Sequence, residues 1–206
     1  MSEDLTKAVA HLRAGGVVAV ATETFYGLCA DAKRASAVEA VFALKGREET
    51  KASALLLPGE DAWGSLVTEV PTLAHRLAAR FWPGPLTIAL PAREEIHPLL
   101  KYRGKVAVRV PGASPALELV RAFGGPLTAT SANPTGAPSS RSADDVKSYF
   151  EGRAGLFVLS GDAPGGMPST VIEVVVGADS PHPEGAWKMV RPGAVPASVL
   201  DELHAA

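Results

Sequence analysis

The sequence is poor in the residues that form disulfides and metal sites. Cys29 is the one cysteine among 206 residues, so no disulfide can form within the chain and no cysteine-based zinc site can be assembled. The five histidines are scattered along the chain without the spacing of metal ligands. We therefore expect no metal held by protein side chains, and a reducing compartment.

Long apolar runs and familiar enzyme motifs are missing as well. No stretch approaches the length that crosses a membrane, and the acidic start, Met1 to Leu5, lacks the pattern of a signal peptide. A soluble, cytoplasmic protein with no membrane partner is therefore expected. The sequence contains no G-x-x-x-x-G-K-[ST], no G-x-G-x-x-G that opens a helix and no G-x-S-x-G. These absences argue against a Walker-type or dinucleotide site and against a serine hydrolase.

Charge of either sign is not in large excess. The formal net charge is −2, so nothing global indicates nucleic-acid binding, although a local basic patch is compatible with this balance. The hydrophobic fraction of 47% is ordinary for a globular protein, and the length suits a single domain over residues 1–206.

Helical and strand patterns alternate along the chain. Apolar periodicity predicts helices over 4–14, through Val38 and Phe42 to Lys45, from Pro71 to Phe81, over 117–123, over 142–150 and from Ser198. Short apolar runs predict strands at 17–21, 54–57, 86–90, 106–110, 127–130, 156–159, 170–176 and 187–190. A polar loop is expected over 22–27. This order predicts an α/β domain with an open, twisted, mixed sheet flanked by helices.

The most polar loop follows the predicted strand that starts at Leu127. It gathers Thr130, Ser131, Asn133, Ser139 and neighbouring hydroxyls before the chain reaches Arg141. Ligands of open α/β sheets lie at the carboxyl ends of strands, so this loop is a candidate site. A turn whose side chains bind their own backbone is the alternative.

Cations follow a predicted helix at Lys45-Gly46-Arg47. This pattern is compatible with simple capping, because glycine and cations both favour helix C-termini. The alternative is a phosphate clamp, in which arginine offers a bidentate fork and lysine a point charge. Lys51 lies close enough in sequence to join such a clamp.

Other candidates lie beside predicted strands. Arg109 interrupts an apolar strand, so it either lies on a solvated face or holds an anion. The loop 22–27 carries hydroxyls and a carboxylate, and its alternative is a turn with an exposed tyrosine. The small residues of 165–170 suit close approach to a ligand or an ordinary connection. Arg191 is either a surface arginine or a phosphate contact.

Taken in order, these segments resemble the threonylcarbamoyl-AMP synthase family of the YrdC/TsaC type, in its single-domain form. The resemblance rests on segments spread over nearly the whole chain: Thr22-Glu-Thr-Phe-Tyr-Gly-Leu28, Phe42-x-x-Lys45-Gly-Arg47, Phe81-Trp-Pro-Gly-Pro-Leu-Thr87, Val106-Ala-Val-Arg-Val-Pro111, Thr130-Ser-Ala-Asn-Pro-Thr-Gly136, Pro168-Ser-Thr-Val171 and Val190-Arg-Pro-Gly193. The paired K-x-R and S-x-N motifs are the family's signature.

The resemblance implies a YrdC-like catalytic domain with a concave, basic cavity. It implies a nucleotidyltransferase that converts L-threonine, bicarbonate or CO₂, and ATP to threonylcarbamoyl-AMP and pyrophosphate. This is the first step of N6-threonylcarbamoyladenosine synthesis in tRNA. Mg²⁺ is expected to come with ATP, without an organic cofactor. Threonylcarbamoyl transferase proteins are the implied downstream partners, and weak binding of tRNA or double-stranded RNA is a further expectation.

The resemblance also implies roles for individual residues. The catalytic tetrad would be Lys45, Arg47, Ser131 and Asn133. Threonine would be held by Thr24, Arg109, Ser131 and Ser169. ATP would be held by Arg47, Lys51, Ala129, Ser139 and Arg191.

The sequence departs from the family pattern at a few positions. Ala21, Cys29 and Glu48 replace a usual proline, glycine and proline, and Lys51 and Leu56 stand where many members have asparagine and histidine. Two other functions stay open. One is a non-catalytic RNA-binding module that uses the same cavity. The other is a carbamoyl-handling enzyme like the hydrogenase-maturation carbamoyltransferases, although those carry zinc-finger cysteines and are much longer.

Overall fold

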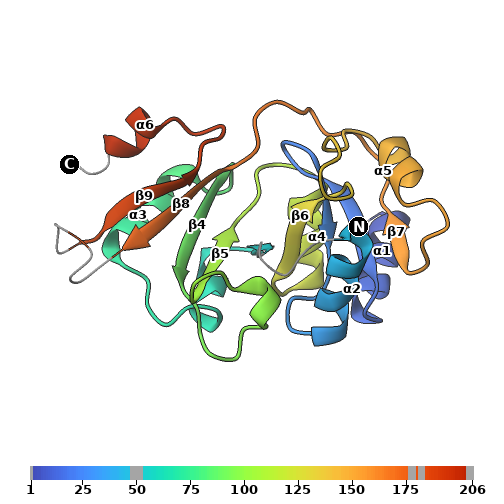
Figure 1. The fold of residues 1–206 in the computed structure, drawn as a ribbon, viewed down its shortest axis with the longest axis horizontal. Coiled ribbons are helices and arrows are strands. Elements are labelled where there is room, and N and C mark those ends of the chain that lie inside the picture. The colour runs from blue at the N-terminus through green and yellow to red at the C-terminus, as the bar shows by residue number, and fades with distance from the viewer. Residues whose placement is uncertain (1, 47–52, 176–179, 181–183, 203–206) are drawn as a thin grey trace.

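A single mixed sheet organises the computed structural model, which describes residues 2–46, 53–175, 180 and 184–202. In the described residues the sheet has nine strands in the order β7-β1-β2-β6-β3-β5-β4-β8-β9. Their bounds are β1 (Val17–Ala21), β2 (Tyr26–Cys29), β3 (Ala54–Leu56), β4 (Leu86–Pro91), β5 (Lys105–Arg109), β6 (Leu127–Ser131), β7 (Leu156–Val158), β8 (Thr170–Val175) and β9 (Ala186–Arg191). Figure 1 shows the two edge strands, β9 and β7, near opposite ends of the molecule.

The pairing of strands confirms the predicted mixed sheet. β1 runs parallel to β7, β3 to β5 and β4 to β8, while the remaining neighbours are antiparallel. The parallel pairs need long crossovers, and the intervening helices supply them.

Helices flank the sheet, close to where the periodicity predicts them. They are α1 (Glu3–Arg13), α2 (Ala35–Lys45), α3 (Thr72–Phe81), α4 (Pro115–Phe123), α5 (Ala143–Tyr149) and α6 (Ala197–Asp201), with short 3₁₀ turns η1 (Glu60–Ser65) and η2 (Pro98–Leu100). α2 ends because Gly46 takes a left-handed φ of 56°, a conformation that glycine adopts without strain. No helix in these described ranges is long and apolar enough to cross a membrane.

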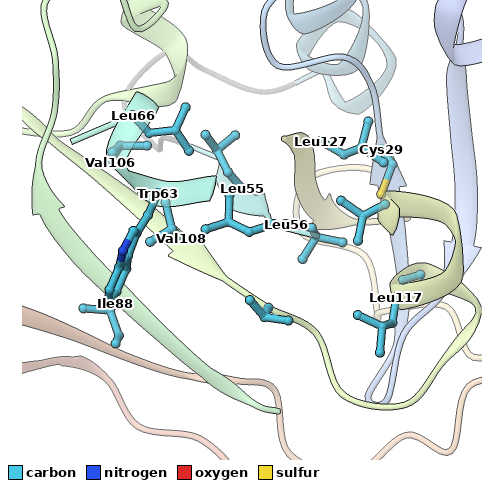
Figure 2. Packing of buried hydrophobic residues seen from close by; sticks show 14 of the residues in the cluster. Cys29, Leu55, Leu56, Trp63, Leu66, Ile88, Val106, Val108, Leu117 and Leu127 are labelled. Atoms are coloured by element: carbon cyan, nitrogen blue, oxygen red, sulfur yellow. The ribbon is translucent and has the colours of Figure 1, made fainter. Parts of the chain in front are cut away.

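Two groups of buried side chains hold the layers together. The larger joins α1, α3 and α4 to the sheet and includes Trp63 of η1, which Figure 2 shows beside Ile88 and Val108. The smaller packs α5 against β1 and β2 through Val146 and its neighbours. Strand β1 is buried on both sides, because its alternate residues belong to different groups.

The alternation of side chains also positions the site. On β4, β5 and β8, the side chains of Ile88, Val108 and Ile172 belong to the larger core. Their neighbours Thr87, Arg109 and Val171 instead line a cavity. Because successive side chains of a strand point to opposite faces, burying one set in the core directs the other toward the cavity.

The expected loop over 22–27 is corrected by the structure, because Tyr26 and Gly27 begin strand β2. Tyr26 is fully buried, not an exposed turn residue. Its hydroxyl lies 2.9 Å from the carbonyl oxygen of Leu159 and 2.6 Å from that of Gly161, and its one proton is shared between these two acceptors. Burial raises the pKa of this phenol to about 12, and the carboxylates of Asp162 and Asp144 act in the same direction. Hydrophobic pairing across the hairpin thus prevails over the local polar pattern.

Removing the Tyr26 hydroxyl should destabilise the fold. We expect Tyr26→Phe to lower the free energy of unfolding by about 1–3 kcal/mol, because it removes the donor to the buried carbonyl group of Leu159. Urea unfolding measures this change. Tyr102→Phe is the matched control, since Tyr102 is 52% exposed. Equal unfolding midpoints for the two variants would contradict the anchoring role of Tyr26.

Candidate active site

A cavity of about 490 Å³ opens at the ends of several strands, between loops that lie far apart in the sequence. It brings together every predicted site residue that the structure describes: Thr24, Lys45, Arg109, Ala129, Ser131, Asn133, Ser139, Ser169 and Arg191. Arg47 and Lys51 lie outside the described residues. The contacts around these lining residues indicate what each can do.

The cavity wall is cationic and rich in hydroxyls. Among the described residues of the lining, the charged ones are Lys45, Arg109 and Arg191. In the same described part of the chain, no cluster of three histidine, cysteine or carboxylate side chains is placed to hold a metal ion. The lining therefore suits anionic groups of a ligand.

The turn between β1 and β2 supplies Thr24 and is closed by Thr22. The hydroxyl of Thr22 donates to the carbonyl oxygen of Phe25 at 2.7 Å. The same hydroxyl accepts from the backbone amides of Thr24 at 3.1 Å and Phe25 at 3.2 Å. Such a side-chain closure of a turn fixes the Thr24 hydroxyl at the cavity wall without help from a ligand.

Arg109 is buried at the end of β5 and forms an ion pair with Glu23. Only 8% of the arginine side chain and 15% of the glutamate side chain are exposed. Nη1 of Arg109 donates to Oε1 of Glu23, and Oε2 of Glu23 is buried without a hydrogen-bond partner among the described residues. Burial lowers the pKa of Arg109, and Glu23 opposes that shift. The sequence left open whether Arg109 faces solvent, and its burial decides the question.

The partner of Arg109 is the main feature that sequence reasoning missed. Glu23 is the acidic residue of the loop 22–25, and its negative charge was the one feature of the sequence that could have indicated a pairing with Arg109. Nothing local connects it to a strand 86 positions away. The thiol of Cys29 lies fully buried near the same guanidinium, and its burial raises its pKa to about 12 although Arg109 acts to lower it.

Lys45 ties the end of α2 to the loop after β6. Its ammonium donates to the carbonyl oxygens of Ser131 at 2.5 Å and Asn133 at 2.8 Å. The backbone carbonyl of Lys45 accepts from the amide of Thr135 at 3.1 Å. Its ammonium is thus bound to the backbone of the S-x-N turn, and this turn is held at the cavity wall.

Asn133 shapes the same turn with its side chain. Its amide nitrogen donates to the carbonyl oxygens of Pro134 at 3.1 Å and Ala137 at 2.5 Å. Its Oδ1 is buried and has no hydrogen-bond partner among the described residues. The hydrogen bonds of the amide nitrogen therefore fix the conformation of the turn.

Comparisons with known proteins identify the family of the chain. A family model described as "Telomere recombination" (Sua5_yciO_yrdC) matches residues 10–193. The chain belongs to the Sua5/YciO/YrdC family. The resemblance seen in the sequence is thereby confirmed, as is the predicted fold class, which solved members of the family share.

Several curated relatives in this family are longer than the chain. A threonylcarbamoyl-AMP synthase of Pyrococcus abyssi (strain GE5 / Orsay) is 35% identical over 198 residues, covering 95% of this chain and 56% of that protein. One of Bacillus subtilis (strain 168) is 36% identical over 170 residues, covering 82% and 49%. The crystal structure of P. abyssi Sua5 complexed with L-threonine matches with a TM-score of 0.87 at 33% identity, covering 98% of this chain and 58% of that one. The chain thus spans about half the length of these relatives.

Thr87, another residue that lines the cavity of this chain, was not assigned a role from the sequence. Thr87 on β4 is 1% exposed and lies against Ser169 and the cavity. Thr87 ends the segment Phe81–Thr87, which contributes to the family resemblance, but its position in an apolar strand did not indicate that it contacts Ser169.

Breaking the buried ion pair should be costly. We expect Glu23→Ala to lower the free energy of unfolding by about 3–5 kcal/mol, because it leaves the Arg109 guanidinium buried without a counter-charge. Chemical denaturation monitored by circular dichroism measures this loss. Glu3→Ala, which breaks the exposed pair of Glu3 and Lys7, should change stability little. If Glu23→Ala and Glu3→Ala lowered the free energy of unfolding by similar amounts, the buried ion pair would not stabilise the protein more than the exposed one does.

Proposed function

We propose that the chain is an L-threonylcarbamoyladenylate synthase. It would convert L-threonine, bicarbonate or CO₂, and ATP to threonylcarbamoyl-AMP and pyrophosphate, the first step of threonylcarbamoyladenosine formation in tRNA. The observation that carries this proposal is one cavity in which hydroxyl side chains meet the cations Lys45, Arg109 and Arg191, which come from α2, β5 and β9. The family membership and the threonine complex of a relative support the choice of substrate.

The proposed substrates divide the cavity wall between them. Threonine is assigned to Thr24, Arg109, Ser131 and Ser169, and ATP to Ala129, Ser139 and Arg191, with Arg47 and Lys51 completing the nucleotide side. Arg109 is suited to a carboxylate because a guanidinium offers several donors in a fixed plane. Glu23 occupies one of these donors and leaves others for the substrate.

The chemistry needs positioning more than a protein nucleophile. The amine of threonine attacks CO₂ to form a carbamate and releases a proton. A carbamate oxygen then attacks the α-phosphorus of ATP, and the bond to pyrophosphate breaks. Arginine, lysine and hydroxyl groups that stabilise charge during such a transfer act by preorganised electrostatics. Exclusion of water by the cavity would protect the carbamate, which is unstable in water.

Mg²⁺ is proposed to enter with ATP as part of the substrate complex. The described lining offers hydroxyls and cations but no carboxylate, so the phosphate oxygens would provide the anionic ligands. The protein's contribution in this proposal is to place the two substrates and to neutralise the triphosphate.

Lys45 and Arg47 take different parts in this proposal. The sequence was compatible with a phosphate clamp formed by both residues. The ammonium of Lys45 donates to two carbonyl groups of the S-x-N turn, and this favours a role in holding Ser131 and Asn133 in place. Arg47 keeps the assignment to the departing pyrophosphate.

Partners and location follow from the proposed reaction. Threonylcarbamoyl transferase proteins would take up the product, and a cytoplasmic setting suits tRNA modification. A non-catalytic RNA-binding module is the alternative use of a cationic cavity. It predicts an RNA complex that weakens steeply with salt and no ATP turnover.

The proposed activity can be tested directly. We expect purified protein with ATP, Mg²⁺, bicarbonate and single amino acids to release pyrophosphate only when threonine is present. Release is measured with a coupled phosphate assay, and mass spectrometry identifies threonylcarbamoyl-AMP. Threonine-independent release, or none, would overturn the proposal.

Loss of Arg47 should slow the chemical step. Removing one such electrostatic contact raises a barrier by about 2.7–4 kcal/mol, so we expect Arg47→Ala to lower kcat by roughly 100- to 1000-fold. Steady-state pyrophosphate release measures kcat. Arg153→Ala, at an exposed arginine outside the cavity lining, is the matched control and should retain wild-type turnover. Unchanged kcat in Arg47→Ala would remove Arg47 from the proposed site.

A further inference from the structure

The hydroxyl of Ser169 is held between two strands. Thr87 on β4 donates from Oγ1 to Oγ of Ser169 at 3.0 Å. Arg191 on β9 donates from Nη2 to the same Oγ at 3.1 Å and to the carbonyl oxygen of Ser169 at 2.7 Å. Ser169 immediately precedes β8, which lies between these two strands in the sheet.

The hydrogen bonds that Ser169 Oγ already accepts determine how its hydroxyl can bind a ligand. A serine hydroxyl has two acceptor lone pairs and one proton to donate. Arginine can only donate, and Thr87 donates in the observed geometry. Both lone pairs of Ser169 Oγ are therefore in use, and its own O–H is the group left for a ligand.

The surroundings of this O–H favour an anionic acceptor. Arg109 and Arg191 both line the cavity beside Ser169. The pKa of Arg191 is lowered by burial and, further, by the charge of Arg109, so the two guanidinium groups act on each other. An anionic oxygen between the two guanidinium groups relieves their repulsion and accepts a hydrogen bond from the Ser169 O–H.

Thr87 lies at a buried position of β4 where packing alone would be satisfied by an apolar side chain. It is 1% exposed, and its strand neighbours Leu86 and Ile88 belong to the core. A buried hydroxyl requires a hydrogen-bond partner, and Ser169 supplies one. This pairing gives the Thr87 hydroxyl a function that valine, which has nearly the same shape, cannot perform.

We propose that Thr87 is a positioning residue that makes the Ser169 hydroxyl a fixed hydrogen-bond donor to the carboxylate of the amino-acid substrate. This inference rests on the proposed function and extends it to a residue that does not need to touch the substrate. Thr87 acts through Ser169, and therefore on the binding of threonine and not on that of ATP.

The first test separates the two substrates. In Thr87→Val we expect the KM for threonine to rise by about tenfold, the loss of one hydrogen bond to a charged group, with kcat and the KM for ATP within about twofold of wild type. Thr87→Ser restores the hydroxyl and should restore the KM for threonine. If Thr87→Val does not fold, Thr87→Ala takes its place with the same expected shift.

A control distinguishes this role from a loss of stability. Thr128 is fully buried on β6, where its hydroxyl accepts from the amide of Ala30 at 2.9 Å, outside the cavity lining. Thr128→Val should lower stability in urea and leave the KM for threonine unchanged. A rise in this KM as large as that of Thr87→Val would overturn the inference, because general destabilisation would then explain both.

A double-mutant cycle tests whether Thr87 acts through Ser169. We expect Ser169→Ala to raise the KM for threonine more than Thr87→Val does, and the double variant to be no worse than Ser169→Ala alone. Additive effects would show that Thr87 acts independently and would overturn the inference. A shift in the KM for ATP in place of threonine would do the same.

Calorimetry keeps this inference distinct from the proposed reaction. Threonine binding is titrated into wild type and Thr87→Val, with and without ATP. If wild type binds threonine but releases no pyrophosphate, the proposed reaction fails while a tenfold weaker binding in Thr87→Val still supports the positioning role. If wild type turns over threonine and Thr87→Val binds it equally well, the positioning role fails and the reaction stands. If wild type does not bind threonine, both fall.

Discussion

A buried arginine needs a counter-charge, and the pairing of Arg109 with Glu23 meets this need beside the cavity, which Arg109 lines. The pair joins the end of β5 to the turn between β1 and β2, which lie in different halves of the sheet order. It holds Thr24 and Arg109 in one wall. It also leaves guanidinium donors facing the cavity. The interaction that makes burial of the cation tolerable therefore also assembles the proposed threonine side.

Hydrogen bonds within the protein also hold other parts of the cavity wall in place. Lys45 donates to the carbonyl groups of the S-x-N turn, and Thr22 closes the turn that carries Thr24. Each of these groups is ordered by protein partners before any ligand arrives. Preorganised donors of this kind stabilise developing charge without reorganising at the moment of reaction. A site that works by positioning, without a protein nucleophile, fits this arrangement.

Ser169 shows how the partners of a group can fix its direction as well as its place. Thr87 and Arg191 occupy its lone pairs, and its proton is left for a ligand. The sheet makes this possible, because β4, β8 and β9 are adjacent and direct one set of side chains into the cavity. The other set, including Ile88 and Ile172, forms the core. Core packing therefore orients the polar groups of the site.

The sequence by itself determined the apolar strands, the helices and the mixed α/β class, because these depend on local periodicity and length. Through its family resemblance it also named nine of the described residues that line the cavity. Strand β2 was missed at Tyr26 because a polar neighbourhood hides a residue whose burial depends on cross-strand pairing. Only the tertiary structure decided the pairings of Arg109 with Glu23 and of Thr87 with Ser169. These partners lie 86 and 82 positions apart, and the order and register of the strands, which local sequence does not encode, bring them together.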